Sequence, residues 1–269
     1  MDQRLTNIRH LALDMDGTIY RGGTLFPFTN PFLRLLDQLG ISYSFLTNNC
    51  SKSLDDYKAH LDSLGVSARR EQIYTSAHAT FEYLKSEHAG LHRLFLIATP
   101  SLTAEVQAAG FQLTADDPQD EPDAVLVAFD MSLTFASLCR AAYWIKQGKP
   151  FFATHPDFVC PTDQPTVIVD CGSICAALTA ATGVRPIAVP GKPDPRMLLG
   201  LASRHSLSPH EMAMVGDRIY TDIEMARRAG ALGILVLTGE ATQRDVDAAS
   251  NQPDIVVNDL ESLGQLLQS

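Results

Sequence analysis

The chain has 269 residues, of which 45% are hydrophobic and 19% charged, and it carries a formal net charge of -10 with a pI near 5.2. This composition suits one large or two modest globular domains with full cores, and it argues against disorder. The acidic balance offers no basic surface to nucleic acid or to anionic lipid, so a phosphorylated ligand would need local positive charge or a metal. The N-terminal residues lack the apolar core of a signal peptide, and no segment approaches the roughly 20 apolar residues of a membrane span. We therefore expect a soluble, cytoplasmic protein that binds neither nucleic acid nor membranes.

The five cysteines are odd in number and form no C-x-x-C pair, which argues against a disulfide framework and against a zinc knuckle. Cys171 and Cys175 could share one helix face, and His88 and His92 repeat that spacing. Neither pair has further candidate ligands nearby in the sequence. We therefore expect the cysteines to be free thiols, and we expect no metal site at either pair.

An apolar run from Ile8 ends in Asp14 and Asp16, a pattern typical of a buried strand that leads into a loop. The elements predicted after it are a helix over residues 27–40 with Asn30 as its N-cap, a strand over 41–47, and a helix over 54–64 capped by Ser53 with Asp56. The order of strand, helix and strand is the beginning of a parallel sheet.

A second series of α/β elements begins near residue 77. It comprises predicted helices over 80–87, 102–109, 135–147 and 174–182, and predicted strands over 94–98, 124–129, 151–154 and 167–169. The acidic segment 115–122 contains prolines and is predicted to be an exposed connection, and residues 155–165 form a proline-rich loop. This series is long enough to form a domain by itself.

The last part of the chain returns to the first pattern. It comprises predicted strands over 187–189, 212–215, 234–237 and 254–257, and predicted helices over 196–205, 222–229 and 260–267. The whole order indicates an α/β protein with a doubly wound, Rossmann-like parallel sheet interrupted by an inserted α/β domain. The expected boundaries are 1–77 plus 187–269 for the core domain and 78–186 for the insertion.

The polar residues at the predicted strand ends are candidates for chemistry. Asp14 and Asp16 would lie beyond the carboxyl end of a parallel strand, where ligands bind in such sheets. Strand alternation places both carboxylates on one side, and Gly17 allows a turn with positive φ. Two neighbouring carboxylates repel each other and need a counter-cation, which for oxygen ligands is most naturally Mg²⁺. By itself, this segment is more typical of a surface turn.

Three further polar groups occupy comparable positions. They are Thr47 with Asn48, Lys192, and Asp217 with Asp222. Each group alone has an ordinary structural explanation, as a turn cap, a solvated loop lysine, or a cap with a surface charge. Only their common order and spacing favours a shared site.

Together, D-M-D-G-T, T-N-N, G-K-P-D-P and V-G-D-R-I-Y-T-D resemble the four motifs of the haloacid dehalogenase superfamily phosphatases. The insertion lies between the second and third motifs, which is the placement of a C2-type cap in that family. T-N-N, G-K-P-D-P and C-G-S-I-C-A-A-L look like the NagD-like or para-nitrophenylphosphatase-like branch, subfamily IIA. The resemblance covers essentially the whole chain.

The resemblance implies a Mg²⁺-dependent phosphatase that acts on a small phosphorylated metabolite, such as a sugar phosphate or a nucleoside monophosphate. In this reading Asp14 is the nucleophile that forms an aspartyl phosphate, and Asp16 is the general acid and base. The roles implied for the other residues are phosphate binding by Thr47, Asn48 and Lys192, and metal binding by Asp14, the Asp16 carbonyl and Asp217, with Asp222 orienting the metal shell.

The inserted domain would choose the substrate, because the core motifs address only the phosphoryl group. Where the branch often has A-T-N-P-D, this chain has A-T-H-P-D, with His155 in the place of Asn. We predict that His155 and Asp157 hydrogen-bond a substrate hydroxyl, with Ser173 as a further specificity residue. Two alternatives stay open: a phosphotransferase of the same superfamily, and a non-catalytic, receiver-like phosphate-binding module. Assembly into a homodimer is also left open.

Overall fold

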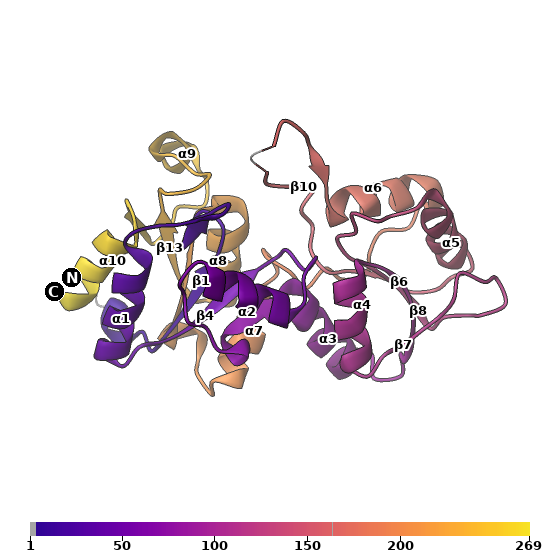
Figure 1. The fold of residues 1–269 in the computed structure, drawn as a ribbon, viewed down its shortest axis with the longest axis horizontal. Helices are drawn as coiled ribbons and strands as arrows, with labels where there is room; N and C mark the ends of the chain where they lie inside the picture. The colour runs from indigo at the N-terminus through magenta and orange to yellow at the C-terminus, as the bar shows by residue number, and fades with distance from the viewer. Residues whose placement is uncertain (1–3, 163) are drawn as a thin grey trace. The chain divides into compact units, whose positions relative to one another are not determined.

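The computed structural model describes residues 4–162 and 164–269, and its internal contacts divide the chain into two compact units (Figure 1). Unit 1 contains the described residues up to Thr47 together with Tyr57–Tyr74 and Lys192–Ser269, and unit 2 contains Asn48–Asp56 and Thr75–Gly191. Two of these boundaries lie a few residues from the seams expected near 77 and 186. The short segment 48–56 belongs to unit 2, which the sequence pattern did not predict. The assignment of the two units to core and cap stays a prediction.

Unit 1 is built around a parallel sheet with the order β14-β13-β12-β1-β4-β5, which confirms the predicted doubly wound α/β fold. Its strands are β1 (His10–Asp14), β4 (Ser42–Thr47), β5 (Ile73–Thr75), β12 (Met212–Gly216), β13 (Leu232–Val236) and β14 (Ile255–Val257). β1 pairs in parallel with both β4 and β12, and every residue of β1, β12 and β13 is buried. Continuous buried runs of this kind are typical of strands that helices cover on both faces.

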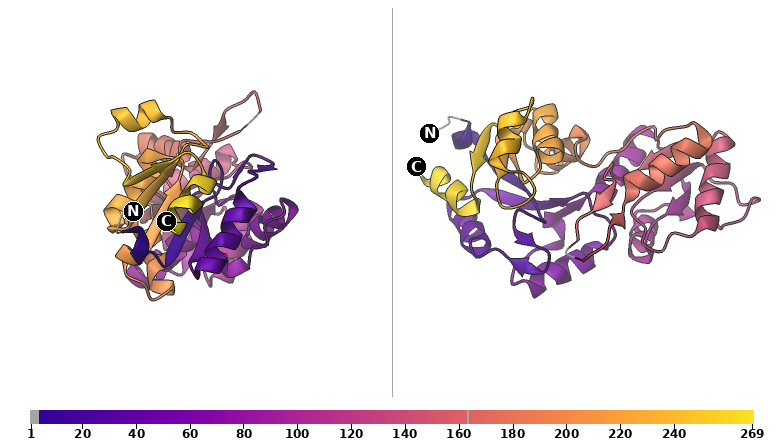
Figure 2. Two further views of the ribbon diagram at one scale, coloured as in Figure 1. Left: turned by 90° about the vertical axis from the view of Figure 1, so that its left-hand side faces the viewer. Right: turned by 90° about the horizontal axis from the view of Figure 1, so that it is seen from above.

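The helices of unit 1 follow the strands in alternation. They are α1 (Thr29–Leu39), α2 (Leu54–Ser63, whose first residues belong to unit 2), α7 (Pro195–Arg204), α8 (Glu224–Ala229), α9 (Gln243–Ala248) and α10 (Leu260–Gln268), with short turns η1 (Leu5–Asn7), η2 (Arg70–Gln72), η3 (Pro209–Glu211) and η4 (Ile219–Ile223). α1 packs beside α10, which Figures 1 and 2 show as adjacent indigo and yellow helices, and α7 packs beside α8. A hairpin of β2 (Tyr20–Arg21) and β3 (Thr24–Leu25) follows β1.

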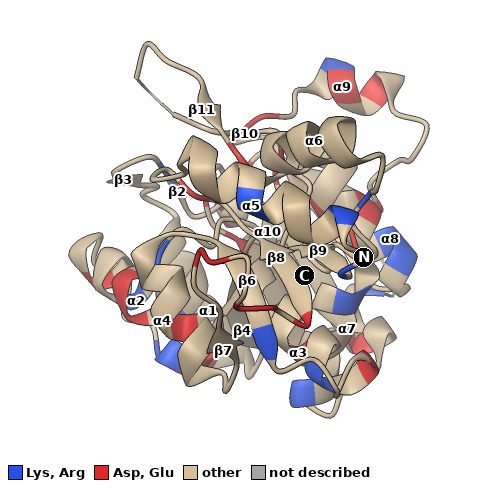
Figure 3. Ribbon diagram, turned by 90° about the vertical axis from the view of Figure 1, so that its right-hand side faces the viewer, with Lys and Arg blue, Asp and Glu red and all other residues tan. Residues whose placement is uncertain are grey.

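Unit 2 contains a smaller parallel sheet with the order β7-β6-β8-β9. Its elements are β6 (Arg93–Ile97), β7 (Gln112–Leu113), β8 (Ala124–Val127), β9 (Phe151–Ala153), α3 (Ser76–Glu87), α4 (Pro100–Ala108), α5 (Phe135–Lys146) and α6 (Cys171–Thr182). α3 and α4 pack on one side of the sheet, and α5 and α6 pack on the other. A separate antiparallel pair joins β10 (Val159–Cys160) to β11 (Ile168–Val169). α6 has no charged residue, as Figure 3 shows by its uniform colour, and its inner face lies in this core.

Two predictions about individual elements were wrong. Asn30 does not cap α1, because the helix begins at Thr29 and Asn30 therefore lies inside its first turn. The Thr29 hydroxyl donates to the Ile19 carbonyl at 2.6 Å. The Asn30 side chain donates to the Gly65 carbonyl at 3.1 Å. Residues 187–189 do not form a strand. Only Ala188 makes a single bridge, to Phe152 of β9.

Several other features agree with the sequence. Ser53 and Asp56 form the reciprocal cap expected for α2, with distances of 3.0 and 3.1 Å. All five cysteines are free, as expected. Among the described residues, no helix has both the length and the apolar character that crossing a bilayer would require.

His10 is a buried histidine of β1 whose role is structural. Its ring is fully buried, its Nδ1 lies 2.7 Å from the Ser42 hydroxyl, and its centroid lies 4.1 Å from that of His205. Burial, reinforced by His205, lowers the pKa of His10 to about 3. The folded protein therefore keeps this ring neutral at pH values where the unfolded chain binds a proton.

This difference predicts an acid-dependent loss of stability. Because the folded-state pKa lies below the unfolded value of 6.5, the contribution of His10 is lost as the pH falls from about 6.5 towards 3. Between pH 7 and 5.5 the free energy of unfolding of the wild type should fall by about 1 kcal/mol more than that of His10→Leu. Urea titrations at both pH values measure this difference. The exposed His210 provides the control variant His210→Asn, and equal pH slopes for all three proteins would exclude His10 as the cause.

Candidate active site

Three neighbouring strands of unit 1 bring predicted site residues to one edge of the sheet. β1 lies between β4 and β12, and all three run parallel. Asp14 is the last residue of β1, Thr47 is the last residue of β4, and Asp217 directly follows β12. Because parallel strands end at the same edge, these side chains converge where ligands bind in such sheets.

Asp14, Asp217 and Asp222 form a carboxylate trio in unit 1, with oxygen atoms that all lie within 4.8 Å of one another. All three residues are buried. The Lys192 ammonium is buried as well and donates to Asp14 and, at 2.7 Å, to Asp222. Arg218 also interacts favourably with all three carboxylates, but Lys192 and Arg218 together bring fewer positive charges than the three carboxylates bring negative ones when ionised.

The pKa values of the trio reflect this excess charge. Burial raises the pKa of Asp14, Lys192 opposes the rise, and Asp222 and Asp217 add to it, with a result of about 8. Burial and the nearby Asp222 raise the pKa of Asp217 to about 6. The pKa of Lys192 is raised as well, because Asp14 and Asp222 outweigh the effect of its burial. A divalent cation at the trio would lower both carboxylate pKa values by favouring the ionised forms.

Asp217 is the residue of the trio that best fits a cation. Its Oδ2 accepts a hydrogen bond from the Glu240 amide at 2.7 Å, whereas its Oδ1 is buried and has no hydrogen-bond partner among the described residues. A buried carboxylate oxygen without a partner is costly unless a ligand satisfies it. The donor set consists of carboxylate oxygens, which hard cations such as Mg²⁺ prefer. The residues therefore fit the expected metal.

Two glycines make room for the Asp217 carboxylate. A Cβ on Gly17 would lie 2.4 Å from Asp217 Oδ2, and a Cβ on Gly239 would lie 1.9 Å from it. Gly17 also adopts the expected positive φ, at 87°. The loop of Thr238, Gly239 and Glu240 thus supports the site, although the sequence analysis did not identify it. The sequence feature that could have identified this loop is the T-G-E tripeptide, which follows the predicted strand over 234–237.

Replacing Gly239 should disturb the metal site without removing a ligand. In Gly239→Ala the new methyl group would displace the Asp217 carboxylate, so we expect Mg²⁺ affinity to fall by about 10- to 100-fold. Calorimetric titration with Mg²⁺ measures the change. Gly23→Ala is the matched control, because a Cβ there meets no atom within 4 Å. Unchanged affinity in Gly239→Ala would contradict the placement of the metal beside Asp217.

Asp16 is not one of the three carboxylates of the trio. Asp16 as a residue is accessible to solvent, but its carboxyl group is partly desolvated by its surroundings. This desolvation raises the pKa of Asp16 above the usual value, although a hydrogen bond from the Gly22 amide opposes the rise. A raised pKa suits a carboxyl group that must give and take a proton. The roles of Asp16 in proton transfer and, through its carbonyl, in metal binding stay predictions.

Asn48 directly follows Thr47 and is counted with unit 2. Both residues are buried. The side-chain amide of Asn48 donates to the Asp157 carboxylate, at 3.1 Å for Oδ2. The expected phosphate ligand of Asn48 is its main-chain N–H, so this side-chain bond leaves the prediction open.

The three predicted specificity residues have different surroundings within unit 2. His155 has no exposed surface, and its ring lies between the Thr154 hydroxyl and the Asp170 carboxylate, each at 2.9 Å. Asp157 is partly exposed, and Ser173 donates to the Phe158 carbonyl at 2.7 Å. Contact of these residues with a substrate stays a prediction. For His155, burial favours a role in holding the loop over direct contact with a ligand.

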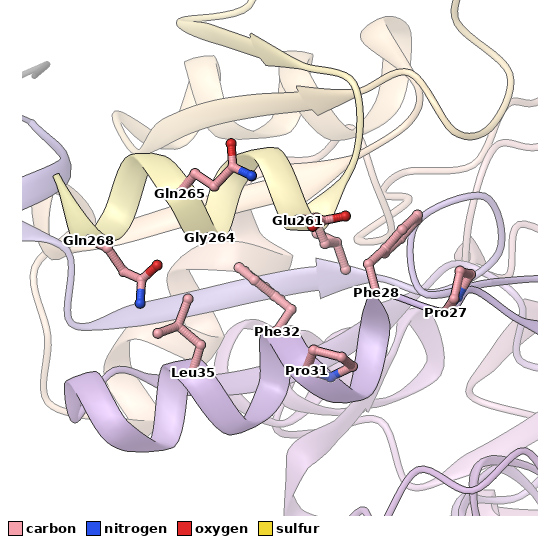
Figure 4. A pocket seen from close by; sticks show the side chains of 10 residues that line it. Pro27, Phe28, Pro31, Phe32, Leu35, Glu261, Gly264, Gln265 and Gln268 are labelled. Carbon is pink, nitrogen blue, oxygen red and sulfur yellow. The ribbon is translucent and has the colours of Figure 1, made fainter.

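A pocket of about 540 Å³ between α1 and α10 lies outside the carboxylate trio (Figure 4). Its lining includes Phe28, Phe32 and Leu35, together with Gln265 and the carboxylate of Glu261. No lysine or arginine lines it, so it does not suit a phosphorylated ligand. The candidate active site is therefore the edge of the sheet that holds the trio.

Comparisons with known proteins agree with this geometry. Family models described as haloacid dehalogenase-like hydrolase and as HAD-hydrolase-like match residues 11–112 and 189–263, which include all four motifs. The chain is 34% identical over 257 residues to a D-glycerol 3-phosphate phosphatase of Mycobacterium tuberculosis, covering 95% of this chain and 70% of the relative. The chain belongs to the haloacid dehalogenase-like hydrolases.

Solved structures extend the match to the whole fold. A 4-nitrophenylphosphatase from Thermotoga maritima superposes with a TM-score of 0.93 at 36% identity, covering 99% of this chain and 100% of that one. A glycerol phosphate phosphatase from Mycobacterium tuberculosis, solved in complex with magnesium, has a TM-score of 0.89 at 33% identity and covers 98% and 79% of the two chains. The resemblance to NagD-like and para-nitrophenylphosphatase-like phosphatases drawn from the motifs is confirmed.

Proposed function

We propose that the chain hydrolyses small phosphate monoesters through an aspartyl-phosphate intermediate on Asp14, with Mg²⁺ as cofactor. The observation that carries this proposal is the buried carboxylate trio, in which Asp14 contacts Lys192 and Asp217 retains an unpartnered oxygen. Phosphoryl transfer depends on positioning and charge neutralisation, which these groups supply together. Bound Mg²⁺ would be held by Asp14, the Asp16 carbonyl and Asp217, with Asp222 orienting the metal shell. It would supply the charge that lets an anionic nucleophile approach an anionic phosphoryl group.

In the first step an Asp14 carboxylate oxygen attacks phosphorus and the bond from phosphorus to the ester oxygen breaks. Asp16 donates its proton to the leaving alcohol. In the second step the Asp16 carboxylate takes a proton from water, the water oxygen attacks phosphorus, and the bond to Asp14 breaks to release inorganic phosphate. Lys192, Thr47 and the Asn48 N–H hold the remaining phosphoryl oxygens.

Two alternatives use the same centre. A phosphotransferase would pass the phosphoryl group from Asp14 to an acceptor other than water. A receiver-like module would hold it without turnover, but such a module needs only about 100 to 150 residues and has no use for Asp16. The presence of unit 2 and of Asp16 therefore favours the hydrolase.

The test is Mg²⁺-dependent release of phosphate from a panel of monoesters: glycerol 3-phosphate, sugar phosphates, nucleoside monophosphates, phosphoglycolate, pyridoxal phosphate and para-nitrophenyl phosphate. We expect turnover that chelation abolishes and Mg²⁺ restores. No release from any ester would overturn the proposal, and phosphate transfer to added alcohols in place of water would favour the phosphotransferase. The cytoplasmic location and assembly as a homodimer are expectations that this test does not address.

A further inference from the structure

His155 lies at the centre of a buried hydrogen-bond network in unit 2. Its Nε2 lies 2.9 Å from Asp170 Oδ1, and its Nδ1 lies 2.9 Å from the Thr154 hydroxyl and 3.4 Å from the Ser76 hydroxyl. The Cys50 thiol is 3.9 Å from the same Nδ1. Both ring nitrogens are therefore engaged with the protein, and a fully buried ring has no face for a substrate.

Asp170 fixes this network to α6. Its carboxylate accepts a hydrogen bond from the Cys171 amide at 2.6 Å and serves as the N-cap of the helix, while its own side chain is almost fully buried. Buried charged groups are retained only where their hydrogen bonds are satisfied. The His155–Asp170 pair consequently ties the T-H-P-D loop to the first turn of α6.

The network reaches Asn48, where the chain enters unit 2. The Ser76 hydroxyl, which contacts His155, donates to the Asn48 carbonyl at 2.6 Å. The Asp157 carboxylate of the same loop accepts from the Asn48 side chain at 3.1 Å. Asn48 is thus held at its main chain and at its side chain, and it directly follows Thr47.

The network also reaches Gly191, where the chain leaves unit 2. The Gly191 amide donates to the Thr154 carbonyl at 2.8 Å. A Cβ on Gly191 would lie 2.6 Å from that carbonyl oxygen and 2.8 Å from the Cβ of His155, so only glycine fits this close approach. Gly191 directly precedes Lys192.

The oxygen and nitrogen atoms of His155, Asp157 and Asp170 also lie within 4.8 Å of one another, which could indicate a second metal site. The same side chains are already used within the protein: His155 Nε2 contacts Asp170, and the Asp157 oxygens accept from Asn48. Hydrogen bonds explain this cluster without a cation.

We propose that His155 and Asp170 are positioning residues, which hold Asn48 and Gly191 and thereby set the main chain at Thr47 and Lys192. This inference rests on the proposed function, in which Thr47, Asn48 and Lys192 bind the phosphoryl group. It differs from substrate choice by His155, because a positioning defect weakens phosphoryl binding and turnover equally for every ester. A small displacement of such groups has a large effect on rate.

The test compares His155→Asn, Asp170→Ser and the double variant. Asp170→Ser keeps a hydroxyl that can cap α6 but cannot reach the ring. We expect each single change to lower kcat/KM by about tenfold for all esters of the panel and to weaken binding of tungstate, an unreactive phosphate analogue, by a similar factor. The double variant should be no worse than either single variant, because the two side chains act as one unit.

Cys139→Ser is the control, since it makes a conservative change at an exposed position of α5 and should leave tungstate binding near the wild-type value. Melting temperatures identify any variant that fails to fold, and if His155→Asn does so, Asp170→Ser decides the question alone. A reordered substrate preference with unchanged tungstate affinity would overturn the proposal in favour of direct contact. An inactive wild type that still binds tungstate would refute the hydrolase and leave the positioning role measurable through tungstate.

Discussion

Asp14→Asn is expected to reduce phosphate release by about 10⁴-fold or more, because the amide cannot form the aspartyl phosphate. The substitution keeps the shape of the side chain and removes one of the three negative charges of the carboxylate trio. Asp217 and Asp222 lose a repulsive neighbour, but Lys192 loses an ionised partner, so the two changes act on stability in opposite directions. Steady-state phosphate release and thermal unfolding measure the two effects.

Asp37→Asn is the matched control, because it makes the same chemical change at an exposed position of α1. Denaturing quench of the wild type during turnover, followed by peptide mapping, should locate the phosphoryl group on the peptide that contains Asp14. A rate for Asp14→Asn near that of the wild type would refute covalent catalysis at this residue, whatever the activity on individual esters.

The sequence was sufficient to predict the residues at the centre of the site, because they lie at the ends of predicted parallel strands. Asp14, Thr47 and Asp217 each come directly at or after an apolar run, and parallel pairing brings such ends together regardless of the loops between them. Lys192 and Asp222 were placed by resemblance, since neither ends a predicted strand. The structure unites them through contacts across 178 and 30 residues of sequence.

The sequence could not predict features that depend on close approach between distant residues. Gly239 meets Asp217 only in three dimensions, and nothing in the T-G-E tripeptide records that the carboxylate needs the space. The burial of His155 could not be predicted either, because it depends on Ser76 and Asp170, which lie 79 and 15 residues away in the sequence. Asn is a residue type that often caps helices, but the contact of Thr29 with Ile19 determines where α1 begins.

Lys192→Met should reduce kcat by about 10²- to 10³-fold while changing KM much less. The ammonium contacts Asp14 and Asp222, so it is placed to neutralise charge that develops around the nucleophile. A group that only docked the ester would change KM instead. Initial rates over a range of substrate concentrations at saturating Mg²⁺ separate the two outcomes, and Lys58→Met, at an exposed lysine paired with Asp62, is the control.

The same substitution should make the stability of the protein depend more strongly on Mg²⁺. Without Lys192 the carboxylate trio has three negative charges and no buried ammonium beside them, so the folded state without metal loses a stabilising partner for each of two carboxylates. A cation that binds only the folded state then restores more stability than it does in the wild type. We expect Mg²⁺ to raise the melting temperature of Lys192→Met by a larger increment than that of the wild type or of Lys58→Met. An equal increment in all three proteins would mean that Lys192 and the metal do not share the charge of the trio.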